Sequence, residues 1–252
     1  MDVRLIIGFL YKNRISFNNI PVILSKLFRN LETVFFFVFL GVILTKMKEK
    51  VAEIFDREAS AIKEIPITDA YENITNIIYR QVHELKGKLI TSGMGKAGQI
   101  ANNIATTFSS TGTPAVFLHP SEAQHGDLGI LQENDILLAI SNSGKTREIL
   151  ELIDLKENLF PGLPVVVITG NANSPLAVKA DHFITTGSPA EVCPLGLTPT
   201  TSTTVFTAIG DALVVLMMEK IGFTPEDYSL RHHGGYLGVK SREKSSRGSI
   251  QK

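Results

Sequence analysis

The sequence predicts an α/β protein built on a doubly wound, five-stranded parallel sheet that is flanked by helices. Between residues 88 and 185, short runs of apolar and β-branched residues alternate with longer segments that have helical periodicity. This alternation is typical of parallel sheets whose strands are joined by helical crossovers. Some of the apolar runs end in glycine or small hydroxyl residues, as expected where strands meet the ligand-binding edge of such a sheet.

Five segments have the length and composition of buried strands, and three helical segments lie between them. The expected strands are Lys88–Thr91, Ala115–Leu118, Ile136–Ile140, Val165–Thr169 and His182–Thr185. The expected crossover helices lie near Gly95–Ser110, Thr146–Leu159 and Ser174–Ala180. A hydroxyl-rich run that ends at Thr204 leads into a further long apolar helix, Val205–Ile221.

The first 46 residues differ in composition from the remainder, and we expect them to lie outside the folded domain. Their apolar run, residues 34–44, is well short of the ~20 residues that span a bilayer, so no stable membrane insertion is expected. No small-residue cleavage site follows that run, as a secretory signal peptide would require. Met47 then opens a helical pattern that continues to Leu85, with a break at Ile65-Pro66. Residues 1–46 are therefore expected to be a misassigned start or a disordered, apolar segment.

The composition excludes several classes of function. The 25 basic residues balance the 25 acidic ones, so no charged surface for nucleic acid is predicted. The single cysteine, Cys193, rules out an intramolecular disulfide and fits the reducing environment of the cytoplasm. With one cysteine and six scattered histidines, no metal site with zinc-ligand spacing is predicted. The Ser-, Arg- and Lys-rich residues 240–252 are expected to form a disordered basic tail.

A phosphate-binding turn is predicted where the third expected strand ends. Its apolar run stops abruptly at Ser141-Asn142-Ser143-Gly144-Lys145-Thr146, and a helical pattern follows at once. Free backbone N–H groups and the helix dipole at such a helix start favour an anion. Three hydroxyl groups add donors there, and Gly144 lets the backbone approach a ligand closely. We therefore predict a cradle for a phosphate group, with an ordinary helix cap as the alternative.

Two nucleotide-binding motifs are matched only in part. The end of the cradle mimics a P-loop, but that motif needs a glycine where Ala139 stands, and we reject it. Gly93-Met94-Gly95-Lys96-Ala97-Gly98 matches the dinucleotide fingerprint, which also requires an acid at the end of the second strand. His119-Pro120 stands there instead. We predict that Gly93 and Gly95 form a second phosphate-facing turn, with Lys96 as a cation and no cofactor, and keep an NAD-dependent oxidoreductase as the least favoured alternative.

Three further side chains are candidates for chemistry. His125 lies in a polar loop between two expected strands, and Glu148 follows Gly144 by one helical turn. His232 lies beside two glycines near the end of the chain. For each of them a structural role is the alternative, namely a structural histidine, a carboxylate paired with a helix start, and a surface turn. Thr200 belongs to a hydroxyl run that either caps the last long helix or lines the cleft.

Five motifs occur in one order along the chain. They are the glycine-lysine turn at Gly93, the loop His119–Gly129, the turn Ser141–Gly144, the segment Cys193–Thr200 and Leu230–Gly235. Together they closely resemble the motifs of arabinose-5-phosphate isomerases, members of the sugar isomerase (SIS) domain superfamily. The resemblance covers residues 47–239, which we take as the SIS domain. It implies interconversion of D-ribulose 5-phosphate and D-arabinose 5-phosphate, a supply step for Kdo, a sugar of lipopolysaccharide and some capsules.

The resemblance also implies roles for individual residues. The catalytic residues of the family fall on Lys96, His125, Glu148 and His232, and its phosphate-binding turn falls on Ser141, Asn142, Ser143 and Thr146. A base must form a cis-enediol, and Glu148 is favoured for this over the two histidines. Lys96 is expected to stabilise negative charge on the substrate oxygens. The family implies a sugar-phosphate substrate and a homotetramer, in which His232 acts in the site of a neighbouring subunit.

The chain departs from the family pattern in three places. Lys145 stands where relatives often carry an acid, which makes the cradle more favourable for an anion. His233 replaces the usual proline, so that either of the two adjacent histidines is the functional one. The chain ends before the pair of CBS domains that is common in the family, so a short form without them is expected. A non-catalytic phosphosugar-binding SIS regulator is the alternative function.

Overall fold

The computed structural model describes residues 31–248 and, within them, the side chains of residues 39–242. The described residues divide into two units, residues 31–57 and 58–248. The described part of the first unit belongs to the long helix α3 (Leu31–Lys63), whose last turns belong to the second unit. The remaining elements all lie in the second unit.

The second unit contains a five-stranded parallel sheet, as the sequence predicts. Its strands are β1 (Leu89–Gly93), β2 (Ala115–Phe117), β3 (Ile136–Ser141), β4 (Val165–Thr169) and β5 (His182–Thr185). They lie in the order β2-β1-β3-β4-β5, and every neighbouring pair is parallel. Within the sheet, β1 is the first strand in the sequence, β2 lies on one side of it and β3 lies on the other. The strand order therefore reverses between β1 and β3.

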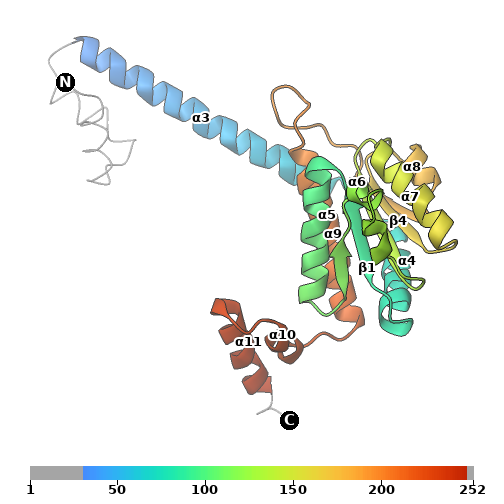
Figure 1. The fold of residues 1–252 in the computed structure, drawn as a ribbon. Coiled ribbons are helices and arrows are strands. Elements are labelled where there is room, and N and C mark those ends of the chain that lie inside the picture. Colours follow the sequence, from blue (N-terminus) through green and yellow to red (C-terminus); the bar gives the residue numbers. More distant parts are fainter. Residues whose placement is uncertain (1–30, 249–252) are drawn as a thin grey trace. The chain divides into compact units, whose positions relative to one another are not determined.

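Helices cover both faces of this sheet (Figure 1). One face packs against α4 (Ala70–Ile78), the π-helical segment η2 (Tyr79–Glu84), α5 (Gly95–Ser110) and α9 (Thr201–Lys220). The other face packs against α6 (Pro120–Ala123), α7 (Arg147–Leu159) and α8 (Pro175–Val178). A short 3-10 helix, η3 (Asp127–Ile130), follows α6, and α10 (Pro225–Arg231) and α11 (Gly235–Gly248) end the described chain.

Alternate residues of the central strand feed the two cores. In β3, Ile136, Leu138 and Ile140 belong to the core under α5 and α9, whereas Leu137 and Ala139 belong to the core under α7. All five of these side chains are fully buried. A strand buried on both faces in this way reads in the sequence as an unbroken apolar run, which is why β3 could be recognised.

Close backbone packing fixes α5 in place. A Cβ atom on Gly98 would lie 2.4 Å from the carbonyl oxygen of Gly93, so only glycine lets α5 approach the end of β1. A Cβ atom on Gly210 of α9 would lie 2.5 Å from the Ile104 side chain of α5. Helix α5 is therefore held tightly on two sides, and it carries Lys96 in its first turn.

At both ends of the described chain the structure differs from the expectation. Helix α3 passes position 47 without a break, because the apolar residues before it contain no proline and continue the helix. Residues 1–30 lie outside the described residues. Residues 240–248 are helical in α11, although disorder was expected. Lys and Arg favour helices, and Gly238 lets α11 pack closely on the carbonyl group of His232.

Helix α9 is a core helix by its packing. Among the described residues it is the one helix with the length and apolar composition of a membrane span, but half of its most apolar stretch is buried inside the protein. Val205, Phe206 and Ile209 are fully buried in the core against α5 and the sheet. The apolar character of α9 is thus explained in part by core packing, while Val215 and Leu216 remain exposed.

Candidate active site

A cleft of about 350 Å³ lies at the carboxyl ends of β1 and β3, where the strand order reverses. Ligands of doubly wound sheets bind at this position. Three segments form its walls: the turn from β1 to α5, the turn from β3 to α7, and the connection from β5 into α9. The lining residues are Met94, Lys96, Ala97, Ile140, Ser141, Asn142, Ser143, Thr146, Glu191, Gly196, Leu197, Pro199, Ser202, Thr203 and Phe206.

The turn from β1 to α5 presents Lys96 to the cleft. Gly95 opens α5 with a φ of +59°, a left-handed conformation that glycine adopts without strain. Lys96 follows in the first turn and is exposed. Within the described residues, no carboxylate forms an ion pair with Lys96. Its positive charge is therefore available to a negatively charged ligand in the cleft.

The turn from β3 to α7 is held by its own hydroxyl groups. The Oγ of Ser141 and the Oγ1 of Thr146 are 2.8 Å apart in a hydrogen bond, and Ser141 Oγ also accepts a hydrogen bond from the Gly144 amide at 3.1 Å. The hydroxyl of Ser143 accepts a hydrogen bond from the Lys145 amide at 3.2 Å. These bonds bend the turn around the carboxyl end of β3, as a phosphate cradle requires.

The structure does not support the simple helix cap as the whole explanation of this turn. Thr146 occupies the N-cap position of α7, but its side chain makes no capping hydrogen bond. Its hydroxyl pairs with Ser141 instead. The first N–H groups of a helix have no partner within the helix. At α7 they remain available to an anion, which the helix dipole also favours.

Gly144 is required for this geometry. Its φ is +61°, in the left-handed region. A Cβ atom there would lie 2.0 Å from the Ser174 hydroxyl, at the start of α8. Both the backbone conformation and the lack of space therefore demand glycine, and they fix the cradle against the neighbouring loop.

Sequence reasoning missed Glu191, an acid in the wall of the cleft. Its Oε2 accepts hydrogen bonds from the Thr200 amide at 2.7 Å, the Thr200 hydroxyl at 2.9 Å and the Ser202 amide at 3.3 Å. Burial acts to raise the pKa of Glu191, but hydrogen bonds from Ser202 and Thr200 outweigh it and hold the pKa below its ordinary value. Glu191 thus stays ionised and secures the start of α9 beside the cleft.

The structure brings together part of the predicted site. Five predicted residues line the cleft: Lys96, Ser141, Asn142, Ser143 and Thr146. The backbones of Gly93 and Gly95 shape the turn that carries Lys96, and Thr200 lies behind the wall, bound to Glu191.

Three of the four predicted catalytic residues, Glu148, His125 and His232, lie outside the cleft wall of this chain. Glu148 is half-buried in the first turn of α7, one residue beyond the start of that helix. His125 is exposed in the turn between α6 and η3. This turn is tied to α7, because Gln124 Nε2 donates a hydrogen bond to Glu151 Oε2 at 2.6 Å. Glu148 and His125 therefore lie on segments that are connected to the cradle helix.

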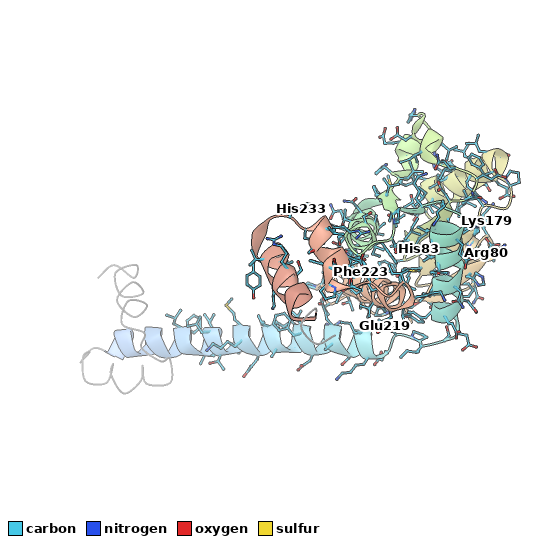
Figure 2. All side chains as sticks on the ribbon, turned by 90° about the horizontal axis from the view of Figure 1, so that it is seen from below. Arg80, His83, Lys179, Glu219, Phe223 and His233 are labelled. Atoms are coloured by element: carbon cyan, nitrogen blue, oxygen red, sulfur yellow. The ribbon has the colours of Figure 1, made fainter. Side chains whose placement is uncertain are left out.

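His232 lies at the other end of the domain from the cleft. Helix α9 begins at Thr201, next to the cleft, and its 20 residues extend for about 30 Å before α10 begins at Pro225. His232 follows α10, where its Nδ1 is 3.0 Å from the Tyr228 carbonyl and its ring stacks on Tyr228 at 3.7 Å. The adjacent His233 is exposed in the linker to α11 (Figure 2). Neither histidine reaches the cleft of its own chain.

Cys193 lies in the connection that forms the third wall. Its Sγ accepts hydrogen bonds from the amides of Thr198, at 3.1 Å, and Leu197, at 3.3 Å. Burial acts to raise the pKa of this thiol, but the bonds from Thr198 and Leu197 bring it below its ordinary value. Among the described residues, no group of three or more His, Cys, Asp or Glu side chains has the arrangement of a metal site.

The chain belongs to the SIS domain family, whose model matches residues 84–216. The match begins at the end of η2 and ends within α9, and so includes the whole sheet and all three walls of the cleft.

Within that family, the chain is similar to arabinose 5-phosphate isomerases of known sequence. The chain is 49% identical to the arabinose 5-phosphate isomerase KdsD of Shigella flexneri over 155 residues, which are 62% of this chain and 47% of the relative. It is 44% identical to KdsD of Yersinia pestis over 185 residues, 73% of this chain and 55% of the relative. The chain thus spans about half the length of the curated relatives that it matches.

Solved structures match over nearly their full length. One is a Bacteroides fragilis protein, described as a candidate phosphosugar isomerase involved in capsule formation. It is 67% identical to this chain with a TM-score of 0.75, and the match covers 75% of this chain and 99% of the B. fragilis chain. Another is an Escherichia coli CFT073 protein solved in complex with arabinose 5-phosphate. It is 34% identical to this chain with a TM-score of 0.68, and the match covers 75% of this chain and 98% of the E. coli chain. The SIS fold therefore accounts for the second unit.

We predict that Gly144→Ala destroys the cradle. The substitution combines a left-handed backbone, which costs about 1–2 kcal/mol for other residues, with a collision against Ser174. Phosphosugar binding, measured by calorimetry, should be lost, and the free energy of unfolding should fall by more than this backbone cost. Gly162→Ala is the matched control, because Gly162 also has a positive φ, +86°, but open space around it. Equal destabilisation in both variants would contradict the role of the contact with Ser174.

We predict that Glu191→Gln lowers the free energy of unfolding at neutral pH by about 1 kcal/mol, as expected for loss of a helix cap. Because the folded-state pKa is depressed, the carboxylate stabilises the protein above its unfolded-state pKa, and this contribution disappears as the pH falls through the lower, folded-state pKa. In urea denaturation, wild type and variant should therefore differ most above about pH 5 and converge in more acidic solution. A difference that stays constant with pH would show that the charge has no part in it.

Proposed function

We propose that this protein is an aldose–ketose isomerase that interconverts D-ribulose 5-phosphate and D-arabinose 5-phosphate and thereby supplies Kdo biosynthesis. The observation that carries the proposal is the cleft at the strand-order reversal, which combines a hydroxyl-rich phosphate cradle with the free cation of Lys96. The KdsD relatives, which bear the name of this activity, share almost half of their aligned residues with this chain. The arabinose 5-phosphate complex of the E. coli structure also supports a sugar-phosphate ligand.

In this proposal the cradle binds the substrate through its phosphate. The hydroxyls of Ser141, Ser143 and Thr146 and the free N–H groups at the start of α7 bind the phosphate oxygens. Fixing one end of an open-chain sugar orients the carbonyl end for reaction, so binding energy is converted into rate. Lys96, on the wall formed by the turn from β1 to α5, stabilises the negative charge that develops on the substrate oxygens as the enediol forms.

Proton transfer between the two carbons is assigned to Glu148, with His125 and His232 as candidates for ring opening and exchange of hydroxyl protons. Glu148 follows Gly144 of the cradle by one helical turn, close to where the phosphate would be held. A carboxylate or an imidazole can each serve as such a base when its pKa is tuned toward neutral pH. No metal or organic cofactor takes part in the proposed reaction.

His232 lies far from the cleft of its own chain, so the proposed reaction requires an oligomer if this residue takes part. The length of α9 separates His232 from the cleft of its own chain, so a second copy must supply this residue if it acts in catalysis. The exposed apolar side chains Val215 and Leu216 on α9 provide a surface for contact between copies. We therefore propose a cytoplasmic homotetramer, with helices from residues 48–85 and 200–221 at its interfaces.

The test is to incubate the purified chain with D-ribulose 5-phosphate in D₂O. The expected product is D-arabinose 5-phosphate that carries deuterium at C2, because an enediol takes its proton from an exchangeable group. NMR spectroscopy detects both the product and the label. A folded protein that forms no arabinose 5-phosphate would contradict the proposal.

The same assay assigns the base. Glu148→Gln should still bind the phosphosugar. Its turnover rate should be about 10²–10⁴-fold lower than that of the wild type, because this is the usual contribution of a general base. Turnover that survives this substitution would transfer the role to a histidine.

A mixing experiment tests the sharing of His232 between copies. Lys96→Ala and His232→Ala should each be inactive alone, but mixing the two variants under conditions of subunit exchange should restore activity. A mixed pair would contain one site with an intact Lys96 from one chain and an intact His232 from the other. If both residues act within one chain, no mixture regains activity, and a parallel His233→Ala series shows which histidine is required.

A further inference from the structure

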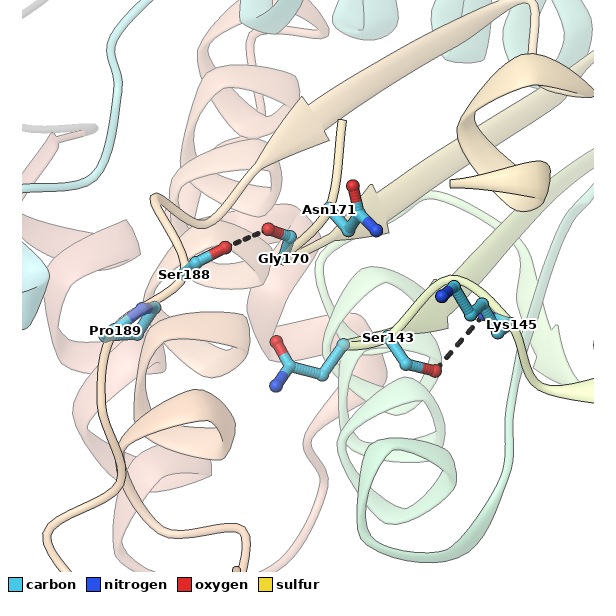
Figure 3. Close-up of a pocket in the computed structure, with 7 residues that line it drawn as sticks. Ser143, Lys145, Gly170, Asn171, Ser188 and Pro189 are labelled. Carbon is cyan, nitrogen blue, oxygen red and sulfur yellow. Dashed lines mark hydrogen bonds between the residues drawn. The ribbon is translucent and has the colours of Figure 1, made fainter. Parts of the chain in front are cut away.

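A second hollow of about 260 Å³ adjoins the cradle on the side of β4 and β5. It is lined by Asn142, Ser143, Lys145, Gly170, Asn171, Ser188 and Pro189, and we call it the Lys145 hollow. Figure 3 shows Gly170 and Ser188 on one side of it and Ser143 and Lys145 on the other. Its volume lies just below the range of about 300–1,000 Å³ that is typical of sites for drug-sized ligands, so it suits a small ligand.

The charge in this hollow is positive and uncompensated. Lys145 is exposed and, within the part of the chain that the structure describes, its ammonium group has neither an ion-pair partner nor a hydrogen-bond partner. Of the residues that the structure describes, no carboxylate lines the hollow. An ammonium group surrounded by neutral polar groups attracts an anion, since nothing else nearby balances its charge.

The neutral groups of the hollow add a hydrogen-bond donor. Asn171 Oδ1 accepts a hydrogen bond from the Asn173 amide at 3.0 Å, which leaves the Nδ2 group of Asn171 as a donor without a partner in the described structure. The Ser143 oxygen accepts from the Lys145 amide, and its own proton is assigned to the phosphate in the cradle. Ser188, by contrast, donates its proton to the Gly170 carbonyl and closes the far side of the hollow.

We propose that the Lys145 hollow binds a small free oxyanion of the phosphate class, separately from the phosphate group held in the cradle. Lys145 supplies the charge, and the Nδ2 group of Asn171 supplies a directed donor. Such charge-assisted hydrogen bonds are stronger than those between neutral groups.

Binding in the hollow affects the cradle through shared residues. Asn142 and Ser143 line both cavities, so the turn from β3 to α7 is a wall between them. Two anions on the two sides of one turn repel each other, and occupation of the hollow therefore weakens phosphosugar binding in the cradle.

The test uses arsenate, a tetrahedral analogue of phosphate whose anomalous scattering locates it in crystals of the full chain. We expect two arsenate positions in the wild-type protein, one beside Ser141 and Thr146 and one beside Lys145. In Lys145→Gln the second position should be lost while the first remains, and Lys145→Arg should retain both. Lys63→Gln, which removes an exposed lysine in the last turn of α3, is the matched control and should also retain both.

The two positions report on separate claims. No arsenate beside Lys145 in the wild-type crystal, or arsenate that persists there in Lys145→Gln, would overturn the proposed site, whether or not the cradle is occupied. An empty cradle with an occupied hollow would count against the proposed phosphosugar site and leave the Lys145 site in place.

Discussion

The burial of β3 on both faces is the constraint on which the rest of the second unit depends. Its side chains fill two cores at once, and its neighbours β1 and β4 supply all of its ladder hydrogen bonds. A strand placed in this way cannot shift by one residue, because every side chain would then change faces. Ser141, the last residue of β3, is consequently fixed in position, and the cradle is built on that buried end.

The cleft combines a rigid side with a more open one. The cradle is braced by Gly144 against Ser174 and by the pair of hydroxyls at Ser141 and Thr146. The opposite wall is the connection from β5 to α9, where Leu195 and Leu197 are largely exposed. Glu191 restrains that connection, because its carboxylate binds the backbone at the start of α9. A phosphate would thus be held by the rigid side. The sugar would face the connection from β5 to α9, which is restrained mainly by Glu191 at the start of α9.

The sequence was sufficient for the parts of this arrangement that are local in the chain. Buried parallel strands read as apolar runs, so β4 and β5 were predicted with their observed limits. The cradle was also predictable, since its hydroxyls lie within six consecutive residues. The position of Glu191 was not, because it depends on the course of the long irregular connection between β5 and α9. The separation of His232 from the cleft likewise follows only from the direction of α9. In α11, polar composition suggested disorder, but contact with α10 gives the segment a helical partner.

Helix α5 shows how packing restricts the freedom of the sequence to drift. Gly98 and Gly210 leave no room for a single added carbon atom on two sides of the helix. On the outer face of α5, Gln99 and Asn103 are exposed, so their side chains are not restricted by close packing. Variation between descendants of this protein is therefore expected to accumulate on the outer face of α5, whereas a change at either glycine would shift the helix as a whole. Since Lys96 is carried by the first turn of that helix, the identity of two residues outside the cleft determines where its positive charge lies.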